Sequence, residues 1–190
     1  MKQIAKGQRG IVYRMGQTAV KKPNPKTSLP FRIENEAKFL RLLNKYNIGP
    51  KFIKFRKDEL SMEFIDGDLI IDYIEKSSKE QVIKVLKGVL KQCYILDKLK
   101  INKYEMTRPY KHIIVKKHKP VMIDFERCKF VDNPKNVTQF VQFMASSRIT
   151  HLLKKNICLD NTKLLKLASK YKKTHSKKDF KQILAQIKNN

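Results

Sequence analysis

Two short apolar runs on either side of a basic turn restrict the fold of this sequence more than any other feature. The first is His112–Val115 and the second is 121–123, opened by Pro120. Short apolar runs bounded by polar residues are typical of buried strands, and the short stretch between these two predicts a hairpin. The second strand ends at Asp124, so it delivers a carboxylate at its C-terminal end. This carboxylate either caps the following turn or belongs to a functional site.

The first 22 residues predict a small antiparallel sheet. Alternating residues and turns place strands near 3–6, 11–15 and 18–22. Pro23 and Pro25 end this sheet. A glycine loop, 7–10, lies between the first two strands, and Gly7 and Gly10 would let the backbone approach a phosphate closely. The same G-x-x-G pattern is also common in ordinary hairpin turns.

The rest of the chain predicts an α+β fold. Helical periodicity follows Pro30, and an Ile-Gly-Pro sequence ends that helix. Two strands come next, and the C-terminal half is mainly helical, with capping boxes at Ser78 and Ser176. The expected elements are helix 31–46, strands 51–56 and 60–65, helices 68–76 and 78–99, one helix between 133 and 153, and two helices in 160–190.

The chain is strongly basic. It has 43 Lys and Arg residues against 17 Asp and Glu residues, a formal net charge of +26. Such a charge attracts phosphate-rich partners, namely nucleic acid, nucleotides or anionic lipid. A lysine-rich solvated surface without a specific partner is the alternative. In the tail the same choice, a solvated helix face or an RNA- or DNA-binding surface, concerns Lys170, Lys172, Lys173, Lys177 and Lys178.

The spacing of the cysteines and the hydropathy of the chain indicate where in the cell the protein is found. Cys93, Cys128 and Cys158 are widely separated and form no C-x-x-C motif, so neither a zinc site nor a disulfide framework is indicated. No apolar run approaches the ~18 residues of a membrane span. The N-terminus lacks the apolar core of a signal peptide. We expect a soluble cytoplasmic protein with reduced thiols and no membrane partner.

Ordered motifs in the N-terminal half resemble those of protein kinases. Residues 5–12, with Ala5, Gly7, Gly10 and Val12, are similar to the kinase glycine loop G-x-G-x-x-G-x-V, with alanine at the first glycine. Residues 19–21 resemble the V-A-I-K strand. This resemblance implies that Ala19 lies in the nucleotide site and that Lys21 binds the nucleotide phosphates.

The helix and strands that follow continue the resemblance. In a kinase-like chain a helix glutamate pairs with the strand lysine, and Glu36 is the preferred residue, with Glu34 as the competitor. The strand 60–65 resembles the kinase hinge. It implies Met62 at the gatekeeper position and an adenine edge bound by the backbone of Glu63, Phe64 and Ile65.

The C-terminal half resembles the catalytic segments of protein kinases, but it departs from their motifs at several positions. No His-Arg-Asp is present in 101–112; Glu105 is the carboxylate of this loop and would stand for the catalytic base. His112 would stand for the metal-binding asparagine, although it comes seven positions after Glu105 where the kinase pattern has five. Asp124 begins Asp-Phe-Glu, similar to D-F-G, and would hold Mg²⁺, while Glu126 replaces the glycine. No A-P-E element follows.

Taken together, these motifs resemble the small archaeal predicted serine/threonine kinases, near the atypical kinases of the RIO and Bud32 kind. The resemblance covers about residues 4–145 and implies a minimal two-lobe kinase-like fold. The N-terminal lobe would be 1–66, a nucleotide-binding antiparallel sheet with one helix. The C-terminal lobe would be the mainly helical 67–190.

The resemblance implies ATP and Mg²⁺ as cofactors and transfer of phosphate to an unidentified protein or small-molecule acceptor. Two alternatives remain open. The missing His-Arg-Asp favours a nucleotide-binding pseudokinase or an ATPase. The charge of +26 favours an RNA-binding module, or contact with a ribonucleoprotein, on a kinase-like scaffold.

Overall fold

The computed structural model describes all residues except 9, 27–30, 155–156, 158 and 189–190. Arg9 of the predicted glycine loop, Pro30 and Cys158 therefore lie outside the described residues. The chain forms two compact units, and each is described by itself. The first contains Met1–Asp66 and Val121–Cys128, and the second contains Gly67–Pro120 and Lys129–Asn190.

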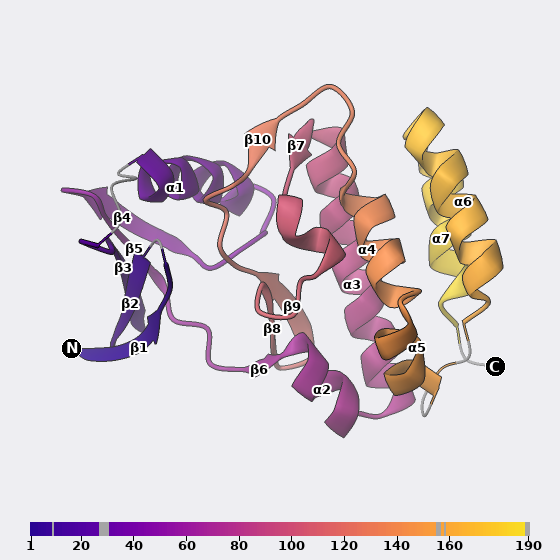
Figure 1. The fold of residues 1–190 in the computed structure, drawn as a ribbon, viewed down its shortest axis with the longest axis horizontal. Helices are drawn as coiled ribbons and strands as arrows, with labels where there is room; N and C mark the ends of the chain where they lie inside the picture. Colours follow the sequence, from indigo (N-terminus) through magenta and orange to yellow (C-terminus); the bar gives the residue numbers. More distant parts are fainter. Residues whose placement is uncertain (9, 27–30, 155–156, 158, 189–190) are drawn as a thin grey trace. The chain divides into compact units, whose positions relative to one another are not determined.

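The first unit is built on a five-stranded antiparallel sheet (Figure 1). The strand order is β1-β2-β3-β5-β4, so β3 is hydrogen-bonded on both edges. This central place buries Ala19, Val20 and Lys21 of β3. The predicted strands are confirmed as β1 (Lys2–Lys6), β2 (Gly10–Met15), β3 (Thr18–Pro23), β4 (Phe52–Arg56) and β5 (Glu59–Glu63).

One helix, α1 (Phe31–Asn44), packs against β3, β4 and β5. It ends two residues before the predicted end because the Asn44 side chain binds the loop that follows. Its amide donates to the carbonyls of Ile48 (3.1 Å) and Pro50 (2.9 Å), and its oxygen accepts the N–H of Phe52 (2.6 Å). The apolar face of α1 is buried through Ile33, Ala37, Phe39, Leu40 and Leu43.

The second unit is mostly helical, and α3 (Lys79–Lys98) is its longest helix. Ser78 and Gln81 form the predicted capping box at its start. The helix then buries the predicted apolar stripe, from Val82 to Leu96. The described residues contain seven α-helices in all; those not yet given are α2 (Ile70–Lys76), α4 (Asn136–Met144), α5 (Ser147–Lys154), α6 (Asn161–Thr174) and α7 (Lys177–Gln186).

Two sequence expectations for the helical half were wrong in detail. The helix predicted from residue 68 begins at Ile70, because Asp68–Leu69 forms the short strand β6 and pairs with β8 (Ile113–Lys116). The single helix predicted between 133 and 153 is two helices, α4 and α5. The break lies at Ser146, whose hydroxyl and backbone N–H both bond to the carbonyl of Phe143, at 2.7 and 3.2 Å.

The predicted hairpin is confirmed as β8 and β9 (Lys119–Met122), and β6 completes a three-stranded sheet. Lys117 and His118 form its turn with left-handed φ of 48° and 61°. At Gly67 a Cβ would lie 2.3 Å from the Val115 carbonyl oxygen, so the junction before β6 requires glycine. β7 (Ile101–Asn102) and β10 (Lys129–Phe130) form a separate pair. None of the described helices combines the length and apolar character needed to cross a membrane.

Candidate functional site

The predicted residues Lys21, Glu36 and Asp124 meet in the first unit. The Lys21 ammonium lies 2.6 Å from Glu36 Oε2 and 3.0 Å from Asp124 Oδ1. A third carboxylate, that of Glu126, lies 3.3 Å from the same nitrogen. Three carboxylates from two distant segments therefore surround one lysine of the central strand.

Glu36 joins α1 to both other segments. One carboxylate oxygen contacts Lys21, and the other accepts the backbone N–H of Phe125 at 3.3 Å. Its side chain is 1% exposed. Glu34, the alternative in the sequence, is exposed instead. The structure therefore places Glu36, of these two glutamates, beside the strand lysine.

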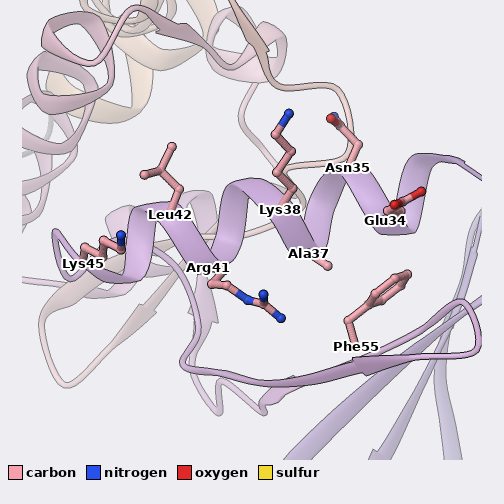
Figure 2. A pocket seen from close by; sticks show the side chains of 8 residues that line it. All are labelled: Glu34, Asn35, Ala37, Lys38, Arg41, Leu42, Lys45 and Phe55. Carbon is pink, nitrogen blue, oxygen red and sulfur yellow. The ribbon is translucent and has the colours of Figure 1, made fainter.

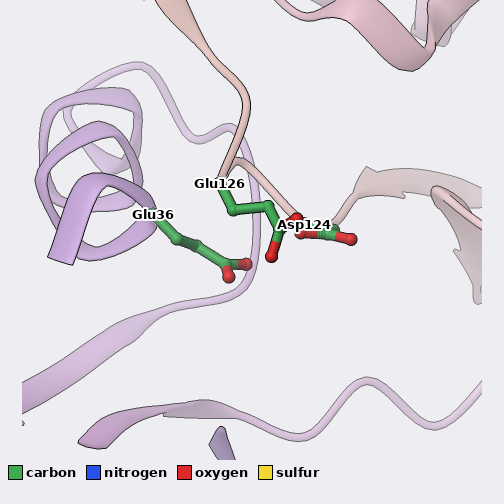
Figure 3. A group of neighbouring side chains, drawn as sticks. All are labelled: Glu36, Asp124 and Glu126. Carbon is green, nitrogen blue, oxygen red and sulfur yellow. The ribbon is translucent and has the colours of Figure 1, made fainter. Parts of the chain in front are cut away.

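The turn that carries Asp124 is fixed to α1. The Asn35 side-chain amide donates to the carbonyls of Glu126 (2.9 Å) and Cys128 (3.0 Å). Phe125 is completely buried, and a Cβ at Gly49 would lie 2.9 Å from its ring. Asp124 has a left-handed φ of 63°, a conformation that aspartate tolerates better than most residues. Packing and hydrogen bonds thus hold both carboxylates of this turn beside the Lys21 ammonium. Figure 3 shows Asp124 and Glu126 next to Glu36.

The site carries an excess of negative charge. Burial alone would lower the pKa of Lys21, but the three surrounding carboxylates outweigh burial and hold this pKa well above its ordinary value. Burial raises the pKa of the Glu36 carboxyl, because loss of water disfavours its charged form more than Lys21 favours it. Arg32 Nη1 lies 3.8 Å from Glu126 and offsets part of the excess.

The carboxylates could also hold a cation. Oxygens of Glu36, Asp124 and Glu126 lie within 4.8 Å of one another, and carboxylate oxygens are ligands that Mg²⁺ prefers. The Asp124 side chain is 33% exposed, against 1% for Glu36 and 7% for Glu126. Asp124 is therefore the carboxylate of the three that is most accessible to a cation from solvent.

The glycine loop lies next to Lys21. The Gly7 N–H donates to the Gly10 carbonyl at 2.9 Å, and the buried Asn24 donates to the carbonyl of Gly7 at 3.0 Å. A Cβ at Gly10 would lie 3.1 Å from Lys21 Cε. Glycine at position 10 therefore makes room for the lysine side chain. Val12 pairs with Lys21 across the two strands.

The predicted hinge consists of the end of β5 and the residues that follow it. Met62 is buried and pairs with Ala19 of β3. The N–H of Glu63 donates to the Lys51 carbonyl and that of Phe64 to the Gln17 carbonyl, both at 2.8 Å. These two backbone amides therefore already donate hydrogen bonds to carbonyls within the first unit. Ile65 is buried, and Arg14 lies over the Phe64 ring, 4.0 Å from its centre.

Glu105 and His112 lie in the second unit, and their placement relative to Lys21 stays a prediction. Glu105 is in the 3₁₀ helix η1 (Tyr104–Thr107). Its side chain is 9% exposed and lies 3.2 Å from the ammonium of the fully buried Lys103. His112 is half-buried directly before β8, and its N–H donates to the Pro109 carbonyl at 3.0 Å.

A buried network that the sequence did not indicate supports the Glu105 segment. Asp97 accepts hydrogen bonds from the backbone and side-chain N–H groups of Asn136 (2.9 and 2.7 Å) and from the Tyr171 hydroxyl (3.1 Å). Asn136 in turn accepts the N–H of Lys103 at 2.7 Å. Burial raises the pKa of Asp97, and these donors oppose that rise.

Glu126 and Asn35 were also missed. The sequence interpretation treated Glu126 as a substitution for glycine, but its carboxylate contacts Lys21. The available signal was that Glu126 carries a negative charge only two residues after Asp124, so its carboxylate could reach the same lysine. Asn35 gave no signal beyond its position next to Glu36, because an asparagine in a helix is commonly exposed.

A hollow of about 650 Å³ lies elsewhere in the first unit, between α1 and Phe55 of β4 (Figure 2). Its lining does not include Lys21, Asp124 or Glu126. It is basic and partly apolar, lined by Glu34, Asn35, Ala37, Lys38, Arg41, Leu42, Lys45 and Phe55.

Comparison with known proteins gives a relative without an assigned activity. No protein-family model matches the chain. The chain is 32% identical over 116 residues to the uncharacterized protein MJ1211 of Methanocaldococcus jannaschii, a match that covers 59% of this chain and 99% of that protein. The chain therefore belongs to the same family as the uncharacterized protein MJ1211.

Proposed function

We propose that this chain is an ATP- and Mg²⁺-dependent phosphotransferase acting on hydroxyl groups, with a minimal two-lobe kinase-like fold of the RIO and Bud32 kind. The observation that carries the proposal is the cluster of Lys21, Glu36 and Asp124. These residues come from a strand after a glycine loop, from the following helix, and from a turn after a hairpin. Kinase-like chains use the same residue types from the same elements in the same order.

The cluster supports phosphate binding through charge and position. Lys21 would bind the nucleotide phosphates, and Glu36 would hold its ammonium in place. Asp124 would hold Mg²⁺, which neutralises charge on the phosphates during transfer. Because the amides of Glu63 and Phe64 already donate within the first unit, the adenine edge is expected to meet the Ile65 N–H.

In the proposed phosphate transfer Glu105 is the base. The bond between the γ-phosphorus and the ADP oxygen breaks, and a bond to the acceptor oxygen forms. The acceptor hydroxyl loses its proton to Glu105, which acts as the base. Lys103, 3.2 Å from Glu105, and the network of Asp97 and Asn136 hold this carboxylate in place. His112 is proposed as the second Mg²⁺ ligand.

The test is transfer from γ-labelled ATP with Mg²⁺, with casein as a generic acceptor. The wild type is compared with Asp124→Asn, because asparagine tolerates the left-handed backbone at this position. Asp132→Asn, which changes an exposed aspartate, is the matched control. We expect labelled protein in the wild type and the control, and a loss of at least about 100-fold in Asp124→Asn, in line with the loss of a major electrostatic group.

Other results would replace the proposal. Free labelled phosphate without labelled protein would make the chain an ATPase. No turnover, with a melting temperature that ATP and Mg²⁺ still raise, would make it a nucleotide-binding pseudokinase. Equal turnover in Asp124→Asn and the wild type would remove the metal assignment.

A further inference from the structure

The C-terminal part of the chain ends in a hairpin of two helices, α6 and α7 (Figure 1). Packing against the rest of the second unit accounts for the residues on its inner face. Within the second unit α6 packs on α4, and α7 packs on α3. The rings of Phe180 and Tyr94 stack with centres 4.3 Å apart, and the Tyr171 hydroxyl donates to Asp97. The buried apolar residues of the two helices are Leu164, Ala168, Tyr171, Phe180 and Ile183.

The outer face of the hairpin is basic, and the exposed acid next to it is Asp160, which caps the start of α6. Between 161 and 188, all described residues, the single acidic residue is Asp179, whose side chain is 4% exposed. It accepts hydrogen bonds from Thr174 (2.6 Å) and Ser176 (2.9 Å) and lies 3.0 Å from Lys170. Nine exposed lysines share this stretch: Lys163, Lys166, Lys170, Lys172, Lys173, Lys177, Lys178, Lys181 and Lys188.

The stability of the two helices explains only part of this distribution. Lys172 and Lys173 lie in the last turn of α6, where the helix dipole favours positive charge. Lys177 and Lys178 begin α7, where the helix dipole disfavours positive charge. Lys177, Lys178 and Lys181 also line a surface hollow of about 490 Å³. The face therefore concentrates positive charge at a cost that a polyanion would offset.

The chemistry of this face selects among polyanions. Proteins that hold single-stranded nucleic acid stack bases on exposed aromatic rings. In this hairpin Tyr171 and Phe180 are 0% and 5% exposed, so neither ring is available to a base. What remains are ammonium groups, which contact phosphates without reading sequence. We propose that the outer face of the α6–α7 hairpin binds the phosphate backbone of double-helical nucleic acid, independently of the phosphotransferase activity.

The experiment measures binding of the full chain to fluorescent 20-base-pair RNA and DNA duplexes across a salt series. The test variant carries Lys172→Gln, Lys173→Gln, Lys177→Gln and Lys178→Gln together. The matched control has the same charge change on four exposed lysines of the first unit: Lys2→Gln, Lys51→Gln, Lys54→Gln and Lys57→Gln. None of the eight side chains is buried, so melting temperatures should show that both variants fold.

We expect the wild type to bind both duplexes with a steep salt dependence. Each lost phosphate contact reduces the slope of log K against log salt by about 0.9, so the test variant should lose up to about 3.6. At ~0.1 M salt its affinity should fall by about 10-fold or more, and that of the control by less than about 3-fold.

Four outcomes would overturn the inference. Equal weakening in both variants would mean that only the total charge matters. A preference above about 10-fold for RNA or DNA, or tighter binding of single-stranded poly(U), would exclude readout of a duplex backbone alone. Hairpin-dependent binding to phosphatidylserine vesicles without duplex binding would make the surface a membrane contact.

Discussion

The Lys21 ammonium lies 2.6 Å from the Glu36 carboxylate, and this pair joins the central strand β3 to helix α1. Both side chains are almost completely removed from water, at 9% and 1% exposure. Asp124 and Glu126 contact the same ammonium, so one positive charge compensates several negative ones. The lysine is therefore important for the stability of this unit.

Removal of this lysine should destabilise the fold. The role that the kinase resemblance implies for Lys21, phosphate binding, predicts that Lys21→Ala abolishes turnover and leaves the fold intact. In the structure the substitution would leave buried carboxylates without their partner, which costs about 3–5 kcal/mol of unfolding free energy. Glu36→Gln should cost less, because Lys21 keeps Asp124 and Glu126. Urea denaturation at pH 7 measures both variants.

The double variant Lys21→Ala/Glu36→Gln is the control for this prediction. It removes one of the uncompensated carboxylates and should recover part of the loss. The destabilisation of Lys21→Ala should also shrink at lower pH, as the carboxylates take up protons. Equal losses in Lys21→Ala and Glu36→Gln would contradict the charge balance described for the cluster.

The two loop glycines should respond differently to alanine. At Gly10 a Cβ would lie 3.1 Å from Lys21 Cε and 3.2 Å from the Lys22 carbonyl, while at Gly7 the nearest atom is 3.5 Å away. Gly10→Ala should therefore cost about 1–2 kcal/mol through overpacking. Gly7→Ala should stay within about 0.5 kcal/mol, as a surface substitution does.

Thermal unfolding with and without ATP and Mg²⁺ checks this pair of variants. Gly10→Ala should also reduce the ligand-induced rise in melting temperature, because the Lys21 side chain must move. Gly7→Ala should keep this rise. If Gly10→Ala proves neutral in both measurements, the close approach of Gly10 to Lys21 has no energetic importance.

Glu126 should limit the binding of free nucleotide. Its carboxylate lies 3.3 Å from Lys21 and would repel the phosphates that approach the same ammonium. Glu126→Gln removes one negative charge while keeping the side-chain size, so affinity for ATP without Mg²⁺ should rise at least about 10-fold, because two unit charges ~4 Å apart repel by about 4 kcal/mol at an effective dielectric constant near 20. Isothermal titration calorimetry with ATP and EDTA measures this change. An unchanged or weaker affinity would contradict the prediction.

Much of the fold could be predicted because it depends on local patterns. Alternation and glycine turns gave the strands β1, β2 and β3, and Ser78 with Gln81 gave the start of α3. The order of motifs identified Lys21, Glu36 and Asp124, which the structure brings together. Each of these signals lies within a few residues of the feature that it predicts.

The contacts that were missed depend on residues far apart in the chain. Asn35 binds the carbonyl of Glu126, 91 residues away, and Asp97 binds Tyr171, 74 residues away. No local pattern distinguishes these side chains from exposed polar residues. The break between α4 and α5 was missed because their combined apolar positions continue one helical period, while Ser146 ends α4 through its own hydrogen bonds.

The turn between α6 and α7 should lose stability in acid through Asp179. Hydrogen bonds from Thr174, Lys170 and Ser176 lower the pKa of this carboxyl from 3.8 to about 2. Above pH 3.8 the carboxylate is ionised in both states, and its contribution is fully present. As the pH falls from 3.8 toward 2, the unfolded chain takes up the proton first, so this contribution is lost. The melting-temperature difference between the wild type and Asp179→Asn should therefore be largest above pH 4 and vanish near pH 2. Asp132→Asn, at an exposed carboxylate, is the control for the loss of one charge. A wild-type advantage that is the same at pH 2 and pH 6 would mean that Asp179 stabilises the turn without its charge.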